Sequence, residues 1–232
     1  MPELPPPLPP GERTVGQLIA ETIRAYGANF WRALPLGVVY AGIDQACVHE
    51  SWLHQLVVYY VAAPFMAAAY VYACSLLLKR RATRTAYVVA LLVYVPFPLL
   101  RGLFLLPGIA WFALFGLAVP ATLVEGLPLR RAIARGRALA ANDYVHALGS
   151  LASLVVVVGI GDQALTQILR AQSRNSQRAA LLLADFVLTP LFYLGGAMLY
   201  TDQAARLRSR RARVHPPLDA DATGHPDPQV EP

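Results

Sequence analysis

Long apolar segments alternate with short arginine-bearing segments along most of this chain. The clearest apolar segments are Trp52–Leu78 and residues 102–124, 144–160 and 179–200. An α-helix rises about 1.5 Å per residue, so about 20 residues cross a hydrocarbon core about 30 Å thick. These four segments therefore predict helices that span a membrane.

Two shorter apolar segments, residues 33–48 and 86–100, predict two further spans. The first contains Pro35 and Asp44, and the second contains Pro96 and Pro98. Residues 86–100 either cross the membrane or re-enter it on the same side. The sequence thus predicts an all-α, polytopic membrane helix bundle with about six transmembrane helices.

Two amphipathic segments predict helices that lie along the membrane surface. In residues 14–30 apolar side chains recur at helical spacing, and Thr14 with Gln17 fits a capping box. In residues 125–142 an arginine face stands opposite an apolar one, and we expect this face to contact anionic lipid headgroups. The arginines of that face are Arg130, Arg131, Arg135 and Arg137.

The distribution of positive charge predicts the orientation. With six spans and a cytoplasmic N-terminus, sixteen of the 20 Lys and Arg residues fall inside and four fall outside. Such a bias is what the positive-inside rule requires. Five spans would place residues 206–213 outside, so six is the better number. We therefore expect a multi-pass protein of the bacterial inner membrane with both termini in the cytoplasm.

Composition supports a membrane protein and limits its other features. Hydrophobic residues make up 56% of the 232 residues and charged residues 15%, against about 25% charged in an average soluble domain. Residues 1–13 and 214–232 are proline-rich, and we expect two disordered cytoplasmic tails around one membrane domain, residues 14–213. The N-terminus lacks the pattern of a secretory signal. Cys47 and Cys74 are expected to be free thiols.

Several ionisable residues fall on the outer half of the predicted topology, where a functional site is the default hypothesis. Asp185 is the strongest candidate, followed by Asp44, His54 and Asp162. Such side chains are able to bind a divalent cation or relay a proton. The competing interpretation is that they are hydrated at the interface or paired with Arg170, Arg174 or Arg178.

The sequence contains no nucleotide-binding loop, zinc pattern or nucleophile motif, and it predicts no cofactor, no metal and no catalytic residue. Nucleic acid is not an expected partner, because the basic segments adjoin the spans. The expected partners are the lipid bilayer with its anionic headgroups and another membrane protein. Pro64, Pro120 and Pro190 interrupt predicted spans, as in many transporters.

Three segments resemble a known family. They are residues 18–31, which begin LIAETIRAY; residues 125–133, EGLPLRRAI; and residues 199–206, which begin LYTD. This layout resembles bacterial six-span membrane proteins related to the membrane domain of some glycerophosphoryl diester phosphodiesterases. The resemblance implies a helical membrane domain without phosphodiesterase activity, since those enzymes carry catalysis in a separate domain.

Three functional hypotheses follow. The first is a non-enzymatic component that organises lipid or a partner protein. The second is a small transporter or transporter subunit with an acidic and histidine site in its outer half. The third, an intramembrane enzyme acting on lipid, has the least support.

Overall fold

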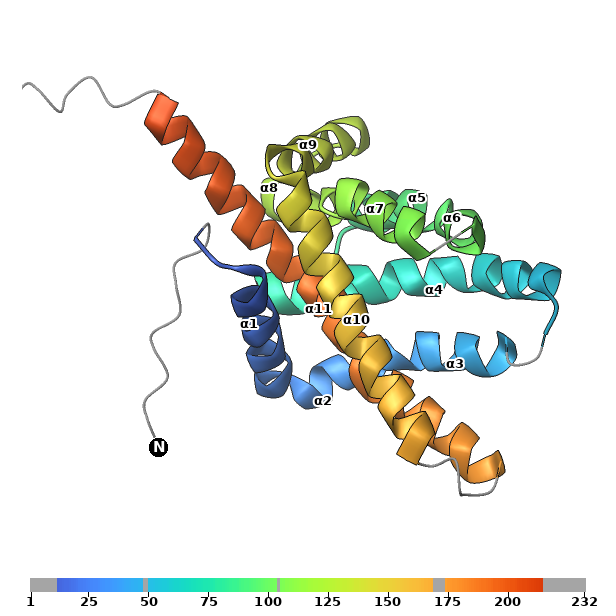
Figure 1. Ribbon diagram of the computed structural model, residues 1–232. Helices are drawn as coiled ribbons and strands as arrows, with labels where there is room; N and C mark the ends of the chain where they lie inside the picture. Colours follow the sequence, from blue (N-terminus) through green and yellow to red (C-terminus); the bar gives the residue numbers. More distant parts are fainter. Residues whose placement is uncertain (1–11, 48–49, 104, 169–173, 215–232) are drawn as a thin grey trace, which may run out of the picture.

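The computed structural model describes residues 12–47, 50–103, 105–168 and 174–214, and these regions fold as helices joined by short connections (Figure 1). The predicted all-α class is confirmed. The predicted tails lie largely outside the described residues. The helices in chain order are α1 (Val15–Ala28), α2 (Phe30–Ala33), the 3₁₀ turn η1 (Leu34–Leu36), α3 (Gly37–Cys47), α4 (Trp52–Leu78), α5 (Arg84–Tyr94), α6 (Phe97–Leu103), α7 (Leu105–Phe115), α8 (Ala118–Glu125), α9 (Leu129–Asn142), α10 (Tyr144–Ile168) and α11 (Arg174–Val214).

Four segments are long and apolar enough to cross a membrane. They are Trp52–Leu78, Leu106–Glu125, Tyr144–Gly161 and Arg178–Arg210, and each overlaps one of the four clearest predicted spans. The protein is therefore a candidate multi-pass membrane protein. Helices α10 and α11 run side by side through the molecule (Figure 1).

The first and third predicted spans form shorter, interrupted helices. Pro35 lies in the 3₁₀ turn that separates α2 from α3, and α3 itself has only 11 residues. A bend at Val95 and Pro96 separates α5 from α6. Proline has no N–H to donate and clashes with the preceding turn, so a continuous helix is not maintained at these positions.

Side chains from neighbouring helices bind carbonyl groups next to these breaks. Proline at position 120 cannot donate to the carbonyl of Gly116, which accepts hydrogen bonds of 3.2 Å from the Val119 backbone N–H and from the Tyr70 hydroxyl. Similarly, Trp111 donates from Nε1 to the carbonyl of Val93 at 2.9 Å, just before the bend at Pro96. Unsatisfied carbonyls are costly inside a membrane, so these contacts stabilise the broken helices.

Helix α1 is amphipathic as predicted, and Thr14 and Gln17 form the predicted capping box. Part of its apolar face packs against other helices. Leu18, Thr22 and Tyr26 are buried, and α1 packs against α10 and α11. The Tyr26 hydroxyl donates to the carbonyl of Val187 at 2.8 Å. The bundle therefore covers part of this face, while Ile23 on the same helix is 50% exposed.

Helix α9 packs through small residues. A Cβ at Gly136 would lie 2.5 Å from the backbone nitrogen of Ala118 in α8, so only glycine permits this approach. Ala132, Leu139 and Ala140 are also buried. The opposite face carries the arginines, which is the amphipathic arrangement predicted for a surface helix.

The polar composition of residues 163–178 predicts the largest outer loop there, and for the described residues of this segment the prediction is wrong. Helix α10 continues to Ile168, and α11 begins at Arg174. Residues 163–168 contain no glycine or proline to end the helix, and polarity alone does not do so. The two cysteines are free, as expected.

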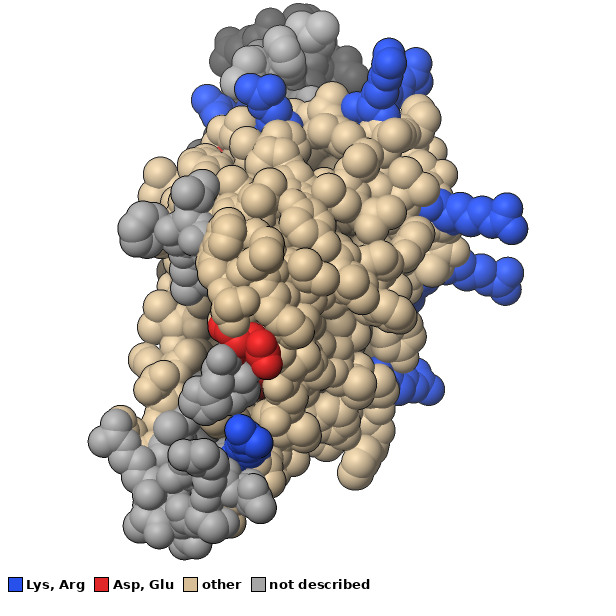
Figure 2. All heavy atoms as spheres, turned by 90° about the vertical axis from the view of Figure 1, so that its right-hand side faces the viewer, with Lys and Arg blue, Asp and Glu red and all other residues tan. Residues whose placement is uncertain are grey.

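Much of the surface is apolar and uncharged. Figure 2 shows a face of the molecule on which most Lys and Arg lie at the upper end and along one edge, with an acidic group near the middle and a basic group near the lower end. Many large apolar side chains of the long helices are exposed, among them Val57, Phe65, Val156 and Leu183. Such a surface suits contact with lipid chains.

Candidate functional site at the arginine-rich end

A buried carboxylate organises the C-terminal half of α11. Asp202 has no exposed side-chain surface, and Arg206 follows it by four residues, on the same helix face. The Arg206 Nε donates to Asp202 Oδ2 at 2.8 Å. A buried carboxylate requires a charged partner or several hydrogen-bond donors, and Arg206 supplies the first of these.

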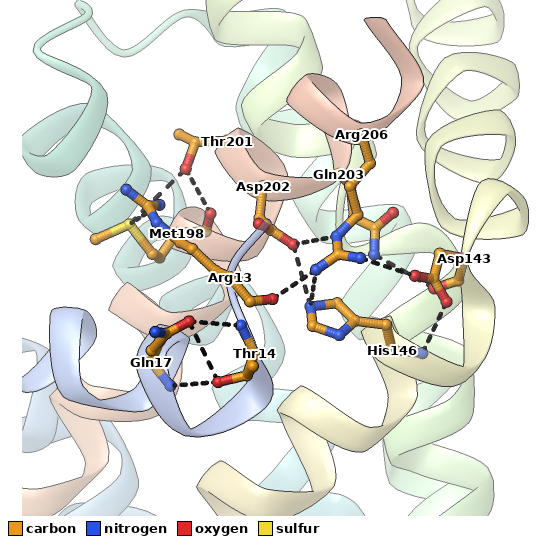
Figure 3. A network of polar contacts seen from close by, with 10 residues as sticks. All are labelled: Arg13, Thr14, Gln17, Asp143, His146, Met198, Thr201, Asp202, Gln203 and Arg206. Atoms are coloured by element: carbon orange, nitrogen blue, oxygen red, sulfur yellow. Dashed lines mark hydrogen bonds and ion pairs between the residues drawn. The ribbon is translucent and has the colours of Figure 1, made fainter. Parts of the chain in front are cut away.

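Arg206 also joins three separate parts of the chain (Figure 3). Its Nη1 lies 3.2 Å from Asp143 Oδ2, at the start of α10, and its Nη2 donates to the carbonyl of Arg13 at 2.6 Å. The planar guanidinium presents its N–H groups in a rigid fork, so it reaches all these acceptors at once. Arg206 thereby ties α1, α10 and α11 together.

His146 completes this polar network from α10. Its Nε2 lies 3.1 Å from Asp202 Oδ2 and 3.3 Å from Arg206 Nη2. A protonated Nε2 donates to Asp202, whereas an unprotonated Nε2 accepts from Arg206, so the two contacts depend on the tautomer. Asp143 Oδ1 also accepts from the His146 backbone N–H at 3.2 Å, so the Asp143 side chain caps the start of α10.

The network does not form a hydrolytic triad. Ser150 lies four residues after His146 on the same helix face, but it is fully buried and its hydroxyl has no hydrogen-bond partner among the described residues. A nucleophile must reach its base and its substrate. The arrangement of His146, Asp202 and Ser150 meets neither condition.

A second polar contact links α8, α9 and α11. Glu125 receives Arg135 Nε at 3.0 Å on each of its two carboxylate oxygens, and the Tyr200 hydroxyl donates to it at 3.1 Å. Nearby, Arg210 Nη1 donates to Asn142 Oδ1 at 3.3 Å. The ends of α8, α9 and α11 are thus joined by polar side chains.

Of the four arginines predicted to contact lipid headgroups, the three other than Arg135 are accessible to a ligand. Arg130, Arg131 and Arg137 are exposed, and none forms an ion pair with another described residue. The loop after α4 adds Lys79, Arg80, Arg81 and Arg84, which are also exposed. We call Arg130, Arg131 and Arg137 the α9 arginines. They differ from Arg135, whose charge is neutralised by Glu125.

The predicted outer residues occupy different environments. Asp185 is buried in α11 with 5% of its surface exposed, and Asp44 is half-buried in α3. His54 is exposed, and its Nδ1 lies 3.9 Å from Glu50 Oε2. Asp162 falls within α10, but its side chain lies outside the described part. No group of three or more metal-binding side chains occurs among the residues that the structure describes.

Sequence reasoning missed the network around Arg206. The available signals were the spacing of four between Asp202 and Arg206, and a histidine in the first turn of an apolar helix. Each is common in helical proteins, and their meeting depends on how α10 packs against α11. Similarly, Glu125 and Tyr200 belong to two of the segments that carry the family resemblance, but the sequence does not indicate that their side chains form a hydrogen bond.

Comparisons with known proteins do not assign the chain to a family. No family model matches the chain, and neither a curated protein nor a solved structure matches it.

Proposed function

We propose that this protein is a non-enzymatic component of the bacterial inner membrane that binds anionic lipid headgroups at its arginine-rich end. The observation that carries the proposal is the difference between the two kinds of arginine at this end. Arg135 and Arg206 are held by carboxylates, while the α9 arginines are exposed and unpaired among the described residues. Exposed arginines beside membrane spans attract anionic lipid.

The contacts at this end support six membrane segments with both termini in the cytoplasm. Polar bonds join residues 13, 125, 142–146 and 200–210, all of which the six-span topology places inside. Because Asp143 and Arg206 form an ion pair, the start of α10 and the C-terminal part of α11 lie at the same end of the bundle. The chain therefore runs away from this end in α10 and back to it in α11. In this arrangement α3 with α4, and α5–α6 with α7–α8, form the other two pairs.

Short-chain lipids added to the purified protein test headgroup binding. Dioctanoyl phosphatidylglycerol should raise the thermal unfolding midpoint in detergent more than dioctanoyl phosphatidylcholine does. The difference should shrink as salt is added, because salt screens exposed charges. Each α9 arginine replaced by glutamine should remove about 1 kcal/mol of the phosphatidylglycerol-dependent stabilisation.

The matched control is Arg135→Gln on the same helix. It removes the same charge, but that charge is already satisfied by Glu125. This variant should lose intrinsic stability and keep the lipid-dependent difference. Equal stabilisation by both lipids, or equal lipid dependence in Arg131→Gln and the wild-type protein, would refute headgroup binding.

Reporter fusions test the proposed orientation separately. Fluorescent protein fused after Arg210 should fluoresce, and alkaline phosphatase inserted after Glu50 should be active, because these reporters work in the cytoplasm and the periplasm respectively. The opposite pattern would place the arginine-rich end in the periplasm and reject the inner orientation.

A small transporter is the second candidate. The observation that favours it is the burial of Asp185 within one of the long apolar helices, where an ionisable residue is costly. Sealed vesicles containing the protein should then take up a cation above the level of empty vesicles. Loss of this uptake in Asp185→Asn would support transport, and uptake equal to that of empty vesicles would reject it.

A further inference from the structure

A cavity of about 250 Å³ lies in the interior of the bundle, between α10, α11 and the helices opposite them. Helices α3, α4, α5, α6 and α7 each contribute to its walls, as the residues Tyr40, Met66, Tyr94, Phe97 and Ile109 show. An apolar cavity of about 150 Å³ is enough to bind benzene. This cavity is therefore large enough for a ring that carries several substituents.

The wall of the cavity is aromatic and uncharged. None of the described residues that line it is Asp, Glu, Lys, Arg or His, and Asp185 of α11 has its own interaction partner within the protein. Tyr94 and Phe97 lie with ring centroids 6.1 Å apart, and Phe192 and Tyr193 with centroids 6.2 Å apart. Another ring packs well against such faces and edges. An ion would lose its hydration here without meeting an opposite charge, so the wall favours an uncharged ligand.

Two hydroxyl groups of the wall have no hydrogen-bond partner. Tyr94 of α5 and Thr189 of α11 line the cavity and are 2% and 6% exposed, and neither hydroxyl is paired with another described group. Buried polar groups are normally paired, so each unpaired group calls for an explanation. A buried water makes about three hydrogen bonds, so two hydroxyls alone satisfy it poorly. An acceptor oxygen on a molecule inside the cavity would pair these hydroxyls, because each still has its proton to donate.

We propose that this cavity binds an uncharged, lipophilic ring that carries carbonyl oxygens, which is the chemistry of a quinone. The aromatic wall packs against the ring, and Tyr94 and Thr189 donate to its carbonyls. A hydrocarbon ring would leave both hydroxyls unpaired. Such a ligand dissolves in a bilayer, and the helices around the cavity include segments long and apolar enough to cross one. Binding in the cavity is independent of headgroup binding at the arginine-rich end.

Duroquinone and durene are matched probes, because both are rings with four methyl groups and only duroquinone has carbonyl oxygens. Isothermal titration of the purified full chain in a neutral detergent, with detergent alone as the blank, should show saturable binding of duroquinone. Durene should bind at least fivefold more weakly, because it accepts no hydrogen bond from either hydroxyl. The anion 2,4,6-trimethylbenzoate, which is of similar size, should not bind.

Two variants remove the hydroxyls and keep the shapes of the side chains. Tyr94→Phe and Thr189→Val should each weaken duroquinone binding about two- to tenfold and leave durene binding unchanged, because only the quinone accepts the hydrogen bond. The thermal unfolding midpoint without ligand should not fall, since the hydroxyl that is removed has no partner. Tyr60→Phe is the matched control, because it makes the same change at an exposed position of α4 that does not line the cavity.

Two further variants fill the cavity. Ile109→Phe and Gly159→Leu add volume to its wall, and a Cβ at Gly159 would have open space around it. Both should abolish the binding of duroquinone and of durene in a folded protein. Gly149→Leu is the control on the same helix, because a Cβ there also has open space but Gly149 does not line the cavity. Monodisperse gel filtration confirms that each variant is folded.

The results discriminate in either direction. Absence of saturable duroquinone binding, equal affinity for durene and duroquinone, or unchanged duroquinone binding in both folded cavity-filling variants would each overturn the proposal. Unchanged duroquinone binding in both Tyr94→Phe and Thr189→Val, or an equal loss of both ligands in them, would overturn it as well. The comparison of the two ligands on the wild type needs no variant, so it decides even where a substitution prevents folding. Headgroup binding is read from the phosphatidylglycerol-dependent shift, so its failure is seen independently.

Discussion

Replacement of Arg206 should damage the protein more than replacement of any exposed arginine. Arg206→Gln removes the cation that faces Asp202, and Asp202 is fully buried. It also removes the N–H donor to the carbonyl of Arg13 and the contact with Asp143. After the change, His146 Nε2 still lies 3.1 Å from Asp202 Oδ2, but the support of the guanidinium is gone.

The magnitude follows from the burial of the partner. Breaking a buried ion pair by removing one member costs about 3–5 kcal/mol, because the remaining charge is left without compensation. Asp143 is 37% exposed at its side chain, so water replaces most of what it loses and its share is small. Arg206→Gln should therefore lower the free energy of unfolding by about 3 kcal/mol or more. Arg206→Lys should lose less, since it keeps the charge but not the fork.

A double-mutant cycle tests this reasoning. Unfolding in mixed micelles of increasing sodium dodecyl sulfate, followed by circular dichroism, gives the free energies. Asp202→Asn should partly rescue Arg206→Gln, with a coupling of about 1.5 kcal/mol or more, because the buried charge disappears. Arg208→Gln is the matched control on the same helix, since Arg208 is exposed, its Nε donates to the carbonyl of Ala204 at 3.3 Å, and it forms no ion pair with a described residue. The reasoning is refuted if Arg206→Gln and Arg208→Gln have equal free energies of unfolding. It is also refuted if the effects of Asp202→Asn and Arg206→Gln on that free energy are additive.

Two substitutions test the packing of the interrupted helices with the same unfolding measurement. A Cβ at Gly37 would fall on the carbonyl oxygen of Phe186, so Gly37→Ala should cost about 1–3 kcal/mol, whereas Gly42→Ala, with open space around it, should be neutral or slightly stabilising; equal effects would contradict the close approach of α3 to α11. Trp111→Phe removes the donor to the carbonyl of Val93 and should cost about 1 kcal/mol. An unchanged midpoint for Trp111→Phe would show that this carbonyl is satisfied in another way.

The sequence predicted the long helices well because length and apolar content decide them directly. Trp52–Leu78 has the same bounds in the sequence analysis and in the structure. Interruptions were harder to place. The sequence shows where the prolines are, but not what each does to its helix. Pro64 and Pro190 lie inside continuous helices, while Pro96 lies in the bend between α5 and α6. The outcome depends on whether neighbouring side chains satisfy the freed carbonyls, and that is a tertiary property.

The candidate site was harder to predict than the fold, for a related reason. The charge pattern selected arginines by their number and position, and it grouped Arg135 with Arg130, Arg131 and Arg137. Only the structure shows that Glu125 holds Arg135 through both carboxylate oxygens. The pairing of polar residues at the start of α10 with those of α11 could not be predicted from the sequence, because these residues lie about 60 positions apart.

Under the proposed function, the division between paired and unpaired arginines gives the arginine-rich end two separable roles. Arg206 contacts groups from three segments, so its hydrogen bonds and ion pairs stabilise the packing of α1, α10 and α11. The α9 arginines contribute little to that arrangement, because exposed charges without partners stabilise a fold only weakly. Variation of salt should therefore affect the two groups unequally. Added salt should weaken the effect of anionic lipid, which acts through the exposed charges, while the stability lost in Arg206→Gln should change little, because Asp202 is shielded from ions by its burial.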